Sequence, residues 1–360
     1  MPETITAAQW NRTLLQRQHL LDRVDEDAVE VIDRCVGLQA QDPQAPFFAL
    51  WSRIADFDPA EVDDLLTDRE LVRMPLQRGT VFLMDALDAR WIRRAVQPVH
   101  DTALARTHLP QLGGIDADQV LAHAAALFAG SDGEAAGVPG ARLRTTLAQT
   151  WPDVPAEALT AVARARLPLV QTPPRGLWGR GGAPVLQILD RWIGPGDPAV
   201  VGDEACRDLI RMYLRGYGPA SAAAIATWSG LTGLGPLLAA MEADWELVKL
   251  AAPDGRELFD LDGLEIASGR EPAPVRLIAP YDGVLVANAD RDRVADREVY
   301  RATVTPNGRS PGFILVDGYL AGTWRLAGGE VELTELTDLT PAQRTGVERE
   351  AARLAAFAAR

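Results

Sequence analysis

A pattern of helices closed by a short hairpin occurs three times along this chain, and it limits the possible folds more than any other feature of the sequence. Each copy ends in an apolar stretch that runs into a turn glycine, at residues 72–79, 170–176 and 248–255. Helices followed by a two-stranded hairpin are the layout of a winged helix, whose hairpin touches phosphates while a helix enters a DNA groove. Because such modules also serve as scaffolds and as protein-interaction domains, the pattern alone leaves DNA binding open.

Periodicity and capping residues place the helices of the three copies. In the first copy, Gly37 is positioned to end one helix and Asp58-Pro59 to begin another. The predicted helices span residues 27–36, 47–54 and 58–66 in the first copy, 117–128, 143–150 and 156–165 in the second, and 204–215, 220–228 and 234–241 in the third. Strands are predicted at residues 71–74 and 80–83, around Arg78-Gly79, and a flexible loop is predicted from Gly130 to Gly140.

Beyond about residue 266 the sequence pattern predicts short strands instead of helices. They are predicted at residues 275–279, 284–286, 312–316, 320–326 and 331–333, with turns at Asn307-Gly308 and Asp317-Gly318, and an amphipathic helix follows at 340–359. Regular short strands with such turns are typical of a small antiparallel barrel. The predicted fold class is therefore α+β: three tandem winged-helix modules at residues 1–100, 101–198 and 199–265, followed by a small antiparallel β-barrel with a C-terminal helix at 266–360.

The overall charge argues against a nucleic-acid partner unless the basic residues are gathered on one surface. The net charge is −14, while 47% of the residues are apolar, which is enough for a sizeable core. We expect a cytoplasmic protein, because the sequence contains neither a leader-like segment nor an apolar run of about 18 residues. Cys35 and Cys206 fall in amphipathic helical patterns and are expected to be buried rather than disulfide-bonded. The four histidines lack the spacing of a zinc site, so we expect no metal.

Several short motifs resemble those of one known family. The segment Leu38-Gln39-Ala40-Gln41-Asp42-Pro43 is similar to the Gln-x-Gln signature of the winged-helix DNA glycosylases that protect producers of DNA-alkylating antibiotics. Further segments that resemble landmarks of that family, in the expected order, are Arg78-Gly79-Thr80, Pro174 through Gly179, Tyr217 through Ser221 and Gly318 through Arg325. The resemblance covers nearly the whole chain.

The resemblance implies a monofunctional DNA glycosylase that removes bulky N7-alkylated purines from double-stranded DNA and unhooks interstrand crosslinks. It implies three winged-helix modules around a DNA channel and no metal or organic cofactor. In that family the neutral Gln-x-Gln form is associated with antibiotic self-resistance, whereas relatives with Gln-x-Asp act on simpler substrates. The family commonly has a histidine three residues after the glycine of the Arg-Gly-Thr element, where this chain has Phe82. Tandem modules in one chain need no partner subunit, so we expect a monomer.

Gln39 and Gln41 are the candidate catalytic residues. Alkylation at guanine N7 makes the base cationic, so the glycosidic bond is already weakened and little catalysis is required. A glutamine carbonyl accepts a hydrogen bond from water and its amide donates one, so two glutamines can orient a water beside the anomeric carbon. In an extended segment both side chains project to one side, whereas in a helix they diverge. The alternative interpretation is a solvated loop after a helix end. Asp42 either stabilises an oxocarbenium-like sugar or starts an ordinary turn.

Four residues on or beside the predicted hairpins are candidate DNA contacts. Arg78, Arg175 and Arg180 carry guanidinium groups that fork onto phosphate oxygens, or else form surface pairs with the many carboxylates. Trp178 either stacks on an exposed base or anchors a glycine-rich turn in the core.

Two other functions remain open from the sequence. The chain is either a DNA glycosylase, a non-catalytic winged-helix regulator, or a protein that sequesters the drug itself. Only the first releases a modified base and leaves an abasic site.

Overall fold

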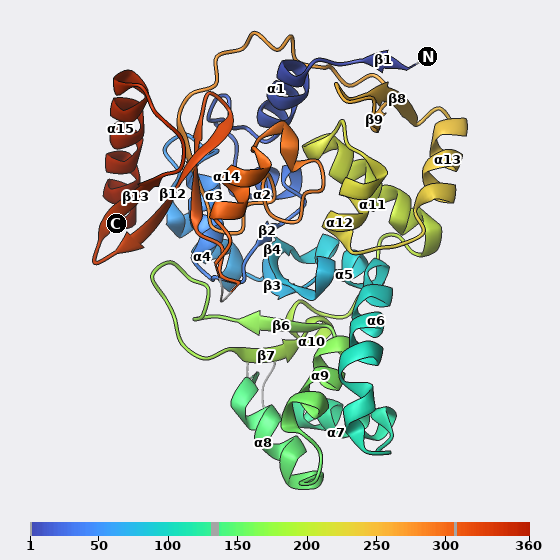
Figure 1. Ribbon diagram of the computed structural model, residues 1–360. Coiled ribbons are helices and arrows are strands. Elements are labelled where there is room, and N and C mark those ends of the chain that lie inside the picture. Colours follow the sequence, from blue (N-terminus) through green and yellow to red (C-terminus); the bar gives the residue numbers. More distant parts are fainter. Residues whose placement is uncertain (1, 131–136, 306–307) are drawn as a thin grey trace. The chain divides into compact units, whose positions relative to one another are not determined.

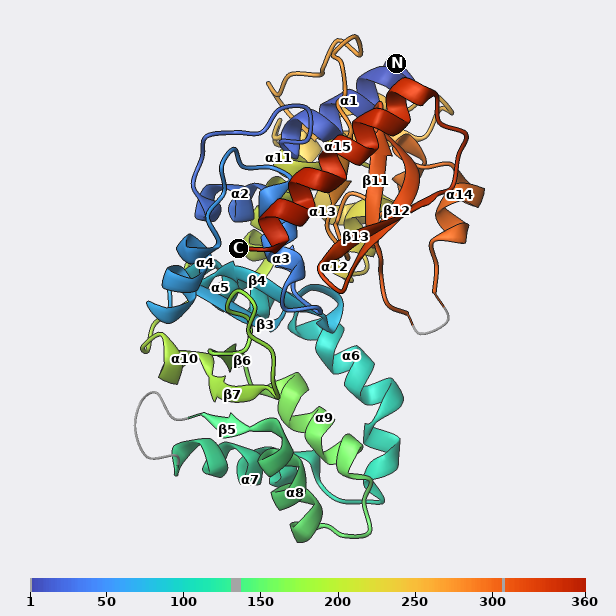
Figure 2. The same cartoon turned by 90° about the vertical axis from the view of Figure 1, so that its left-hand side faces the viewer.

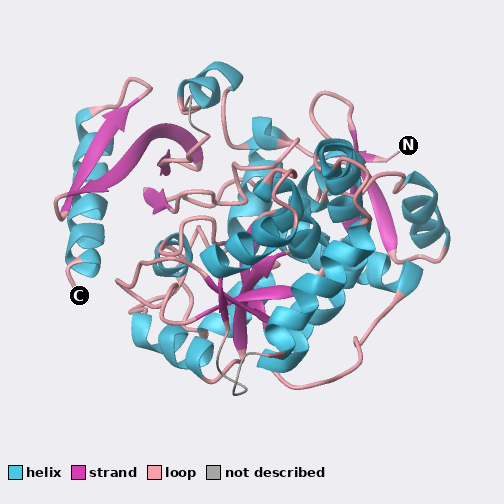
Figure 3. Ribbon diagram, turned by 90° about the horizontal axis from the view of Figure 1, so that it is seen from below, coloured by secondary structure: helices cyan, strands magenta, loops and turns pink. Residues whose placement is uncertain are grey.

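The computed structural model describes residues 2–130, 137–305 and 308–360. Over these residues the chain forms fifteen α-helices and thirteen short strands, which gather in several small sheets (Figure 1, Figure 3). The predicted α+β class is confirmed. The chain divides into two compact units: unit 1 comprises Met1–Phe57, Arg207–Trp228 and Gly233–Arg360, and unit 2 comprises Asp58–Cys206 and Ser229–Thr232. The finer division at residues 100, 198 and 265 stays a prediction.

Each unit holds helices and short strands. The elements of unit 2 are α4 (Pro59–Thr67), β3 (Leu71–Pro75), β4 (Val81–Asp85), α5 (Ala86–Ala95), α6 (Gln97–Thr107), α7 (Ala117–Ala129), β5 (Val138–Pro139), α8 (Gly140–Thr150), α9 (Ala156–Arg166), β6 (Leu169–Thr172), β7 (Val185–Ile188) and α10 (Leu189–Trp192). Those of unit 1 are β1 (Glu3–Thr4), α1 (Ala7–Arg17), α2 (Ala28–Arg34), β2 (Leu38–Gln39), α3 (Ala45–Trp51), α12 (Ala222–Ser229), α13 (Gly235–Ala243), β8 (Leu247–Ala251), β9 (Glu257–Leu261), β10 (Arg276–Ile278), α14 (Arg297–Ala302), β11 (Gly312–Val316), β12 (Tyr319–Ala327), β13 (Glu330–Glu335) and α15 (Pro341–Ala358). Helix α11 (Gly202–Tyr217) begins in unit 2 and ends in unit 1.

The second predicted copy folds as helix, strand, two helices and a returning hairpin (Figure 2). Helix α7 is followed by β5, α8 and α9, and β6 and β7 complete an antiparallel sheet in the order β5-β7-β6. Apolar side chains at helical spacing form its core, and the buried ones include Val120, Ala124 and Phe128 of α7, Leu143 and Leu147 of α8, and Leu159, Val162 and Ala163 of α9. The periodicity that predicted these helices therefore also determines which faces meet.

The third copy has the same order of elements. Helix α11 is followed by an isolated bridge at Ala220, by α12 and α13, and by the hairpin β8–β9. The bridge joins Ala220 to Phe259 of β9, so the Ala220 segment, β9 and β8 correspond to β5, β7 and β6 of the second copy. Strand β1 pairs in parallel with β8 on its other side.

The helices and the hairpin predicted for the first copy also form. The side chains of Asp27 and Asp58 cap the N-termini of α2 and α4, and Gly37 lies in the left-handed region after the end of α2. Strands β3 and β4 pair antiparallel. At the turn between them, Arg78 and Gly79 have φ values of 55° and 72°. A glycine adopts such angles without strain, whereas they strain the backbone of an arginine. The contacts around the turn therefore hold it in this conformation.

The predicted C-terminal β-barrel is wrong. Strands β10, β11, β12 and β13 form an open antiparallel sheet in sequence order, and nothing in the described part of the chain closes it. The apolar run at residues 284–286, predicted as a strand, lies in turns, with Val284 and Leu285 buried. Because a short apolar run fits a buried turn as well as a strand, periodicity alone misassigned it. Without it, too few strands remain for closure.

Helix α15 packs against this open sheet instead. Thr340 and Gln343 form a capping box at its start, as expected for a helix that begins near residue 340. Its buried stripe includes the predicted Val347, Ala351 and Leu354 together with Phe357. The Phe357 ring lies about 6 Å from the rings of Phe48, Trp51 and Phe57, so this helix also completes an aromatic cluster.

Other differences from the sequence predictions are local. Helices α5 and α6 have no counterpart among the predicted elements. Cys35 is buried as expected, but Cys206 is only half-buried, and both cysteines are free. Gly140 begins α8 and therefore does not belong to a loop. Residues 131–136 of the predicted loop, and Asn307 of a predicted turn, lie outside the described residues.

Candidate active site and DNA-contact residues

The Gln-x-Gln segment leaves the end of α2 in an extended conformation. Gln39 is the second residue of β2 and is half-buried, Ala40 is fully buried, and Gln41 is exposed at the bend that follows. Burial therefore alternates with period two over Leu38–Gln41, which is typical of an extended segment. The extended alternative therefore describes the segment better than the helical one.

Asp42 acts as a turn residue. Its Oδ1 accepts a hydrogen bond from the Gln44 N–H at 2.9 Å, and its carbonyl oxygen accepts one from the Ala45 N–H at 3.2 Å. These bonds form an Asx-type turn that leads into α3. The turn interpretation thus explains this side chain, without calling on a catalytic role.

Three consecutive residues at the end of α11 contact three consecutive residues at the end of α2. Arg215 forms an ion pair with Asp33 at 2.6 Å. A side chain on Gly216 would collide with the carbonyl oxygen of Arg34. The Tyr217 hydroxyl donates a hydrogen bond to the Cys35 carbonyl oxygen at 3.2 Å. Because only three residues separate Cys35 from Gln39, these contacts fix the starting point of the Gln-x-Gln segment.

A buried polar network lies against the same end of α2. The guanidinium of Arg53 is paired with both carboxylate oxygens of Asp282, at 2.9 and 3.1 Å, and both side chains are almost completely buried. Arg53 also donates to the Gln18 side chain, which accepts a weaker bond from the Cys35 thiol at 3.5 Å. Burial raises the pKa of Cys35 to about 11, so its thiol is protonated at neutral pH and unreactive. Cys35 is structural here.

Arg78 lies at the tip of the β3–β4 hairpin and is half-buried. Its guanidinium carbon lies 5.6 Å from the centre of the Phe82 ring. His100 of α6 packs beside the same turn, where its Nε2 lies 3.1 Å from the Leu76 carbonyl oxygen. Burial, and then the charge of Arg93, lower the pKa of His100 to about 4, so this histidine is neutral at physiological pH.

The loop between β6 and β7 carries the other three predicted contacts. Arg175 and Trp178 are half-buried, and Arg180 is exposed. The Trp178 N–H donates to Asp63 of α4 at 2.7 Å, and Arg73 of β3 donates to the Arg175 carbonyl oxygen at 3.2 Å. Both anchors belong to unit 2, so the loop is tied to the rest of that unit. The backbone of Trp178 is therefore anchored, while its side chain is only half-buried.

The six predicted residues are thus distributed over both units. Gln39 and Gln41 belong to unit 1, whereas Arg78, Arg175, Trp178 and Arg180 belong to unit 2. Sequence reasoning did not find the residues that hold the Gln-x-Gln segment. Only Tyr217 stood in a segment singled out by resemblance. The Arg53–Asp282 pair spans 229 positions, and nothing local marks it.

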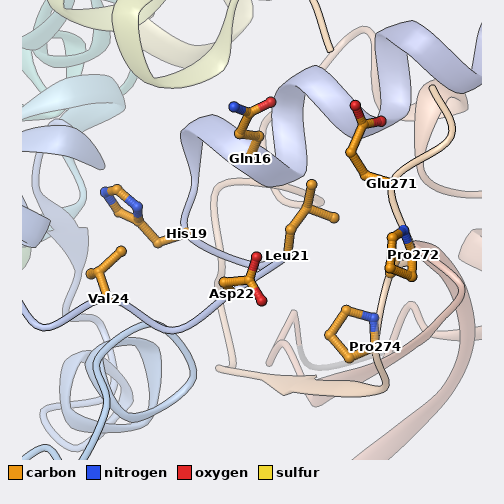
Figure 4. Close-up of a pocket in the computed structure, with 9 residues that line it drawn as sticks. Gln16, His19, Leu21, Asp22, Val24, Glu271, Pro272 and Pro274 are labelled. Atoms are coloured by element: carbon orange, nitrogen blue, oxygen red, sulfur yellow. The ribbon is translucent and has the colours of Figure 1, made fainter. Parts of the chain in front are cut away.

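The pockets formed by the described residues include one in each unit. The one in Figure 4 belongs to unit 1 and has a volume of about 590 Å³. It is lined by Gln16, His19, Leu21, Asp22, Val24, Glu271, Pro272, Ala273 and Pro274. The other, of about 480 Å³ in unit 2, is lined by residues 68–69 and 190–195. Neither contains a predicted site residue, so neither identifies the position of a substrate.

The described part of the chain holds no group of three or more His, Cys, Asp or Glu side chains arranged to bind a metal ion. None of its helices combines the length and the apolar character that crossing a bilayer requires.

Comparison with known proteins gives a consistent relationship. The family model described as "DNA glycosylase AlkZ-like" matches residues 32–357. A curated protein, the interstrand DNA cross-link repair glycosylase of Streptomyces sahachiroi, is 29% identical over 162 residues, which cover 42% of this chain and 43% of that protein. The alignment therefore spans less than half of the curated relative. The solved structure of the Streptomyces sahachiroi DNA glycosylase AlkZ superposes with a TM-score of 0.80 at 21% identity, covering 99% of this chain and 97% of that one, which establishes the fold.

Proposed function

Because this chain belongs to the AlkZ-like DNA glycosylase family, we propose that it is a monofunctional DNA glycosylase that hydrolyses the N-glycosidic bond of bulky N7-alkylated purines in double-stranded DNA. The proposal extends to unhooking of interstrand crosslinks, since the similar Streptomyces sahachiroi protein is named for crosslink repair. Self-resistance to a DNA-alkylating natural product is the role suggested by the neutral Gln-x-Gln form of the motif.

The observation that carries this proposal is the alternation around Ala40. Gln39 and Gln41 are the more exposed residues on either side of the buried Ala40, so we place their side chains on one side of an extended segment, opposite Ala40. Two amide side chains on one side can hold a single water, one through its carbonyl oxygen and the other through either group. The contacts of Arg215, Gly216 and Tyr217 with the end of α2 support this by limiting the motion of the segment.

The proposed reaction needs no acid on the protein. The water attacks the anomeric carbon as the bond to the purine nitrogen breaks, and the bonding electrons neutralise the positive charge of the alkylated base. The attacking water loses a proton to solvent, which leaves a hemiacetal abasic sugar and a free neutral base. A glutamine is too weak a base to take that proton, so the role of Gln39 and Gln41 is orientation. The mechanism therefore uses no metal and no cofactor.

Winged-helix modules are part of the same proposal. In the second and third copies the chain runs helix, strand, helix, helix, strand, loop, strand, and the first strand pairs with the last. That order is the one a winged helix requires, and it supports DNA as the partner. We propose that the protein acts in the cytoplasm as a monomer, with Arg78, Arg175, Arg180 and Trp178 contacting the duplex.

The direct test is base release from duplexes that carry defined N7-guanine adducts, from small to bulky, in buffer containing EDTA. The expected result is a free modified base and an alkali-labile abasic site, with bulky adducts preferred. Preference for one undamaged duplex sequence without base release would instead identify a regulator. Binding of the drug in the absence of DNA would identify a sequestration protein.

A further inference from the structure

Basic side chains are concentrated in one short part of this acidic chain. Residues 138–188, from β5 to the end of β7, contain six arginines and only two acidic residues, whereas the whole chain has 36 basic and 50 acidic residues. The six are Arg142, Arg144, Arg164, Arg166, Arg175 and Arg180. A polyanion responds to the charge at the surface it touches, so this segment can attract DNA despite the negative total.

Four of these arginines form no ion pair with a carboxylate in the described residues. Arg142 and Arg144 of α8, Arg164 of α9 and Arg180 of the β6–β7 loop are exposed, and none of them forms an ion pair within residues 2–130, 137–305 and 308–360. By contrast, Arg166 pairs with an aspartate of α7 at 2.5 Å. Exposed guanidinium groups without carboxylate partners are available to an external anion.

The exposed face of α8 carries small side chains between two arginines. At 3.6 residues per turn, Ala141 and Thr145 lie at the centre of that face, and Arg142 and Arg144 lie on its two edges, about 160° apart. The buried leucines of α8 lie on the opposite side. Small side chains let the helix approach a nucleic-acid backbone, while the long arginine side chains reach out on either side.

Arg164 brings a third guanidinium to the start of α8. A Cβ on Gly140, the first residue of α8, would lie 3.8 Å from the Arg164 Nη2 atom and 3.5 Å from the Pro184 carbonyl oxygen. The first turn of α8 contains no acidic side chain that would compete for these guanidinium groups. Pro184 ends the loop that carries Arg180. Basic groups from α8 and α9 therefore gather at one end of the module, next to the base of its hairpin loop.

We propose that Arg142, Arg144 and Arg164 form a surface, here named the α8 surface, that binds the phosphates of duplex DNA. This inference rests on the proposed function, in which duplex DNA is the substrate, and it adds residues that lie outside the family motifs. Guanidinium groups fork onto phosphate oxygens, and phosphate contacts carry no sequence information. The α8 surface thus holds the duplex regardless of sequence or damage, and the base is recognised elsewhere.

The test compares two triple variants of equal charge. The first is Arg142→Gln, Arg144→Gln and Arg164→Gln. The control is Arg297→Gln, Arg301→Gln and Arg349→Gln, three exposed arginines of unit 1 that also lack ion pairs in the described chain. Fluorescence anisotropy measures the affinity of each for an undamaged labelled duplex over a range of salt concentrations. Because the duplex is undamaged, the result does not depend on whether the protein excises bases.

The α8 variant is expected to bind at least about tenfold more weakly than wild type at low salt, and to lose about two to three units from the slope of log affinity against log salt. The control is expected to change the affinity by less than about threefold, through the shared change in net charge. Equal behaviour of the two variants would overturn the proposal. So would unchanged DNA binding by the α8 variant together with lost binding to poly-glutamate, because that outcome assigns the surface to an acidic protein.

Discussion

The second and third helix-hairpin copies share one topology and carry opposite charges. From the first strand to the last, residues 138–188 contain six basic and two acidic residues, whereas residues 220–261 contain two basic and six acidic residues. In the second copy four arginines are exposed and lack ion pairs within the described chain. In the third copy, both basic side chains form ion pairs. Lys249 pairs with Glu242 and Glu257, and Arg256 pairs with three aspartates.

The difference shows that two copies of one topology make different use of their charged side chains. Polar and charged side chains of the third copy bind the rest of unit 1. Asp260 accepts two hydrogen bonds from Arg17 of α1, at 2.7 and 2.8 Å. Ser221 and Arg256 both bind Asp290, in the turn-rich segment that precedes α14. Helix α11 of the same copy contacts the end of α2. These contacts support the proposal that the third copy is a scaffold for the Gln-x-Gln segment, whereas the second copy carries the proposed DNA contacts.

The largest effect is expected on stability, at the link between α1 and the third copy. Burial raises the pKa of Asp260 even with Arg17 beside it, so the carboxylate depends on that guanidinium. Arg17→Leu should lower the free energy of unfolding by about 3–5 kcal/mol, because it leaves a buried charge unpaired. The matched change in the second copy, Arg142→Leu, should cost less than about 0.5 kcal/mol. Urea unfolding followed by circular dichroism measures both free energies. Similar losses in the two variants would contradict the difference between the two copies.

Acid should destabilise both units through one histidine in each, the half-buried His19 and the buried His100. Burial, followed by nearby arginines, lowers the pKa of His19 in unit 1 and of His100 in unit 2 to about 4. Between pH 6.5 and 4 the unfolded chain therefore binds protons that the folded chain does not, so stability is complete above about pH 6.5 and falls as the pH is lowered. The loss should reach about 3 kcal/mol per histidine near pH 4. His19→Gln and His100→Gln should each flatten this dependence, measured as the urea midpoint of unfolding against pH. If a variant retains the wild-type slope, the histidine that it lacks does not contribute to the pH dependence.

Charge reversal at the two hairpins should separate their roles in DNA binding. Arg180→Glu in the second copy should weaken binding to undamaged duplex by about tenfold and flatten the salt dependence, equally for all sequences. Lys249→Glu in the third copy should have less than about a threefold effect, because that side chain already pairs with two glutamates. Anisotropy titrations would contradict the division if Lys249→Glu were the more damaging change.

A smaller effect is expected where α11 holds the Gln-x-Gln segment. Tyr217→Phe removes the hydroxyl that binds the Cys35 carbonyl oxygen but keeps the ring, which stacks on Tyr213 at 5.0 Å. One hydrogen bond contributes about 0.5–1.5 kcal/mol, so excision should slow by about twofold to tenfold while DNA affinity stays constant. Tyr213→Phe is the control on the same helix. If both variants excise at the wild-type rate and lose only stability, α11 does not position the segment.

Local features of the sequence predicted most of the helices and hairpins. Caps such as Asp27 and Asp58 and apolar spacing within α7, α8 and α9 are encoded within a few residues, so periodicity finds them. The extended form of the Gln-x-Gln segment was one of two open alternatives, and the burial of Ala40 decides between them.

Features that depend on distant contacts could not be predicted. The charge contrast between the two copies can be counted in the sequence. Only the structure shows which arginines form ion pairs, because Arg256 pairs with Asp290 and Asp292 on another segment. The prediction of a barrel was wrong for a related reason. The apolar residues after Asp282 fit a buried strand as well as a buried turn. The partner of Asp282 that stabilises the turn, Arg53, lies far away in the sequence.

The most direct test of the central claim, that Gln39 and Gln41 orient the attacking water, is single-turnover base release from an N7-alkylated or crosslinked duplex at saturating enzyme. Gln39→Ala and Gln41→Ala should each slow excision by roughly tenfold to a thousandfold, with DNA affinity and folding little changed. The double variant should lose less than the product of the single losses, because two residues that hold one water act as a unit. Gln41→Asp should retain activity on simple cationic adducts. Wild-type excision rates in both alanine variants would contradict the claim and identify the segment as a solvated loop after a helix end.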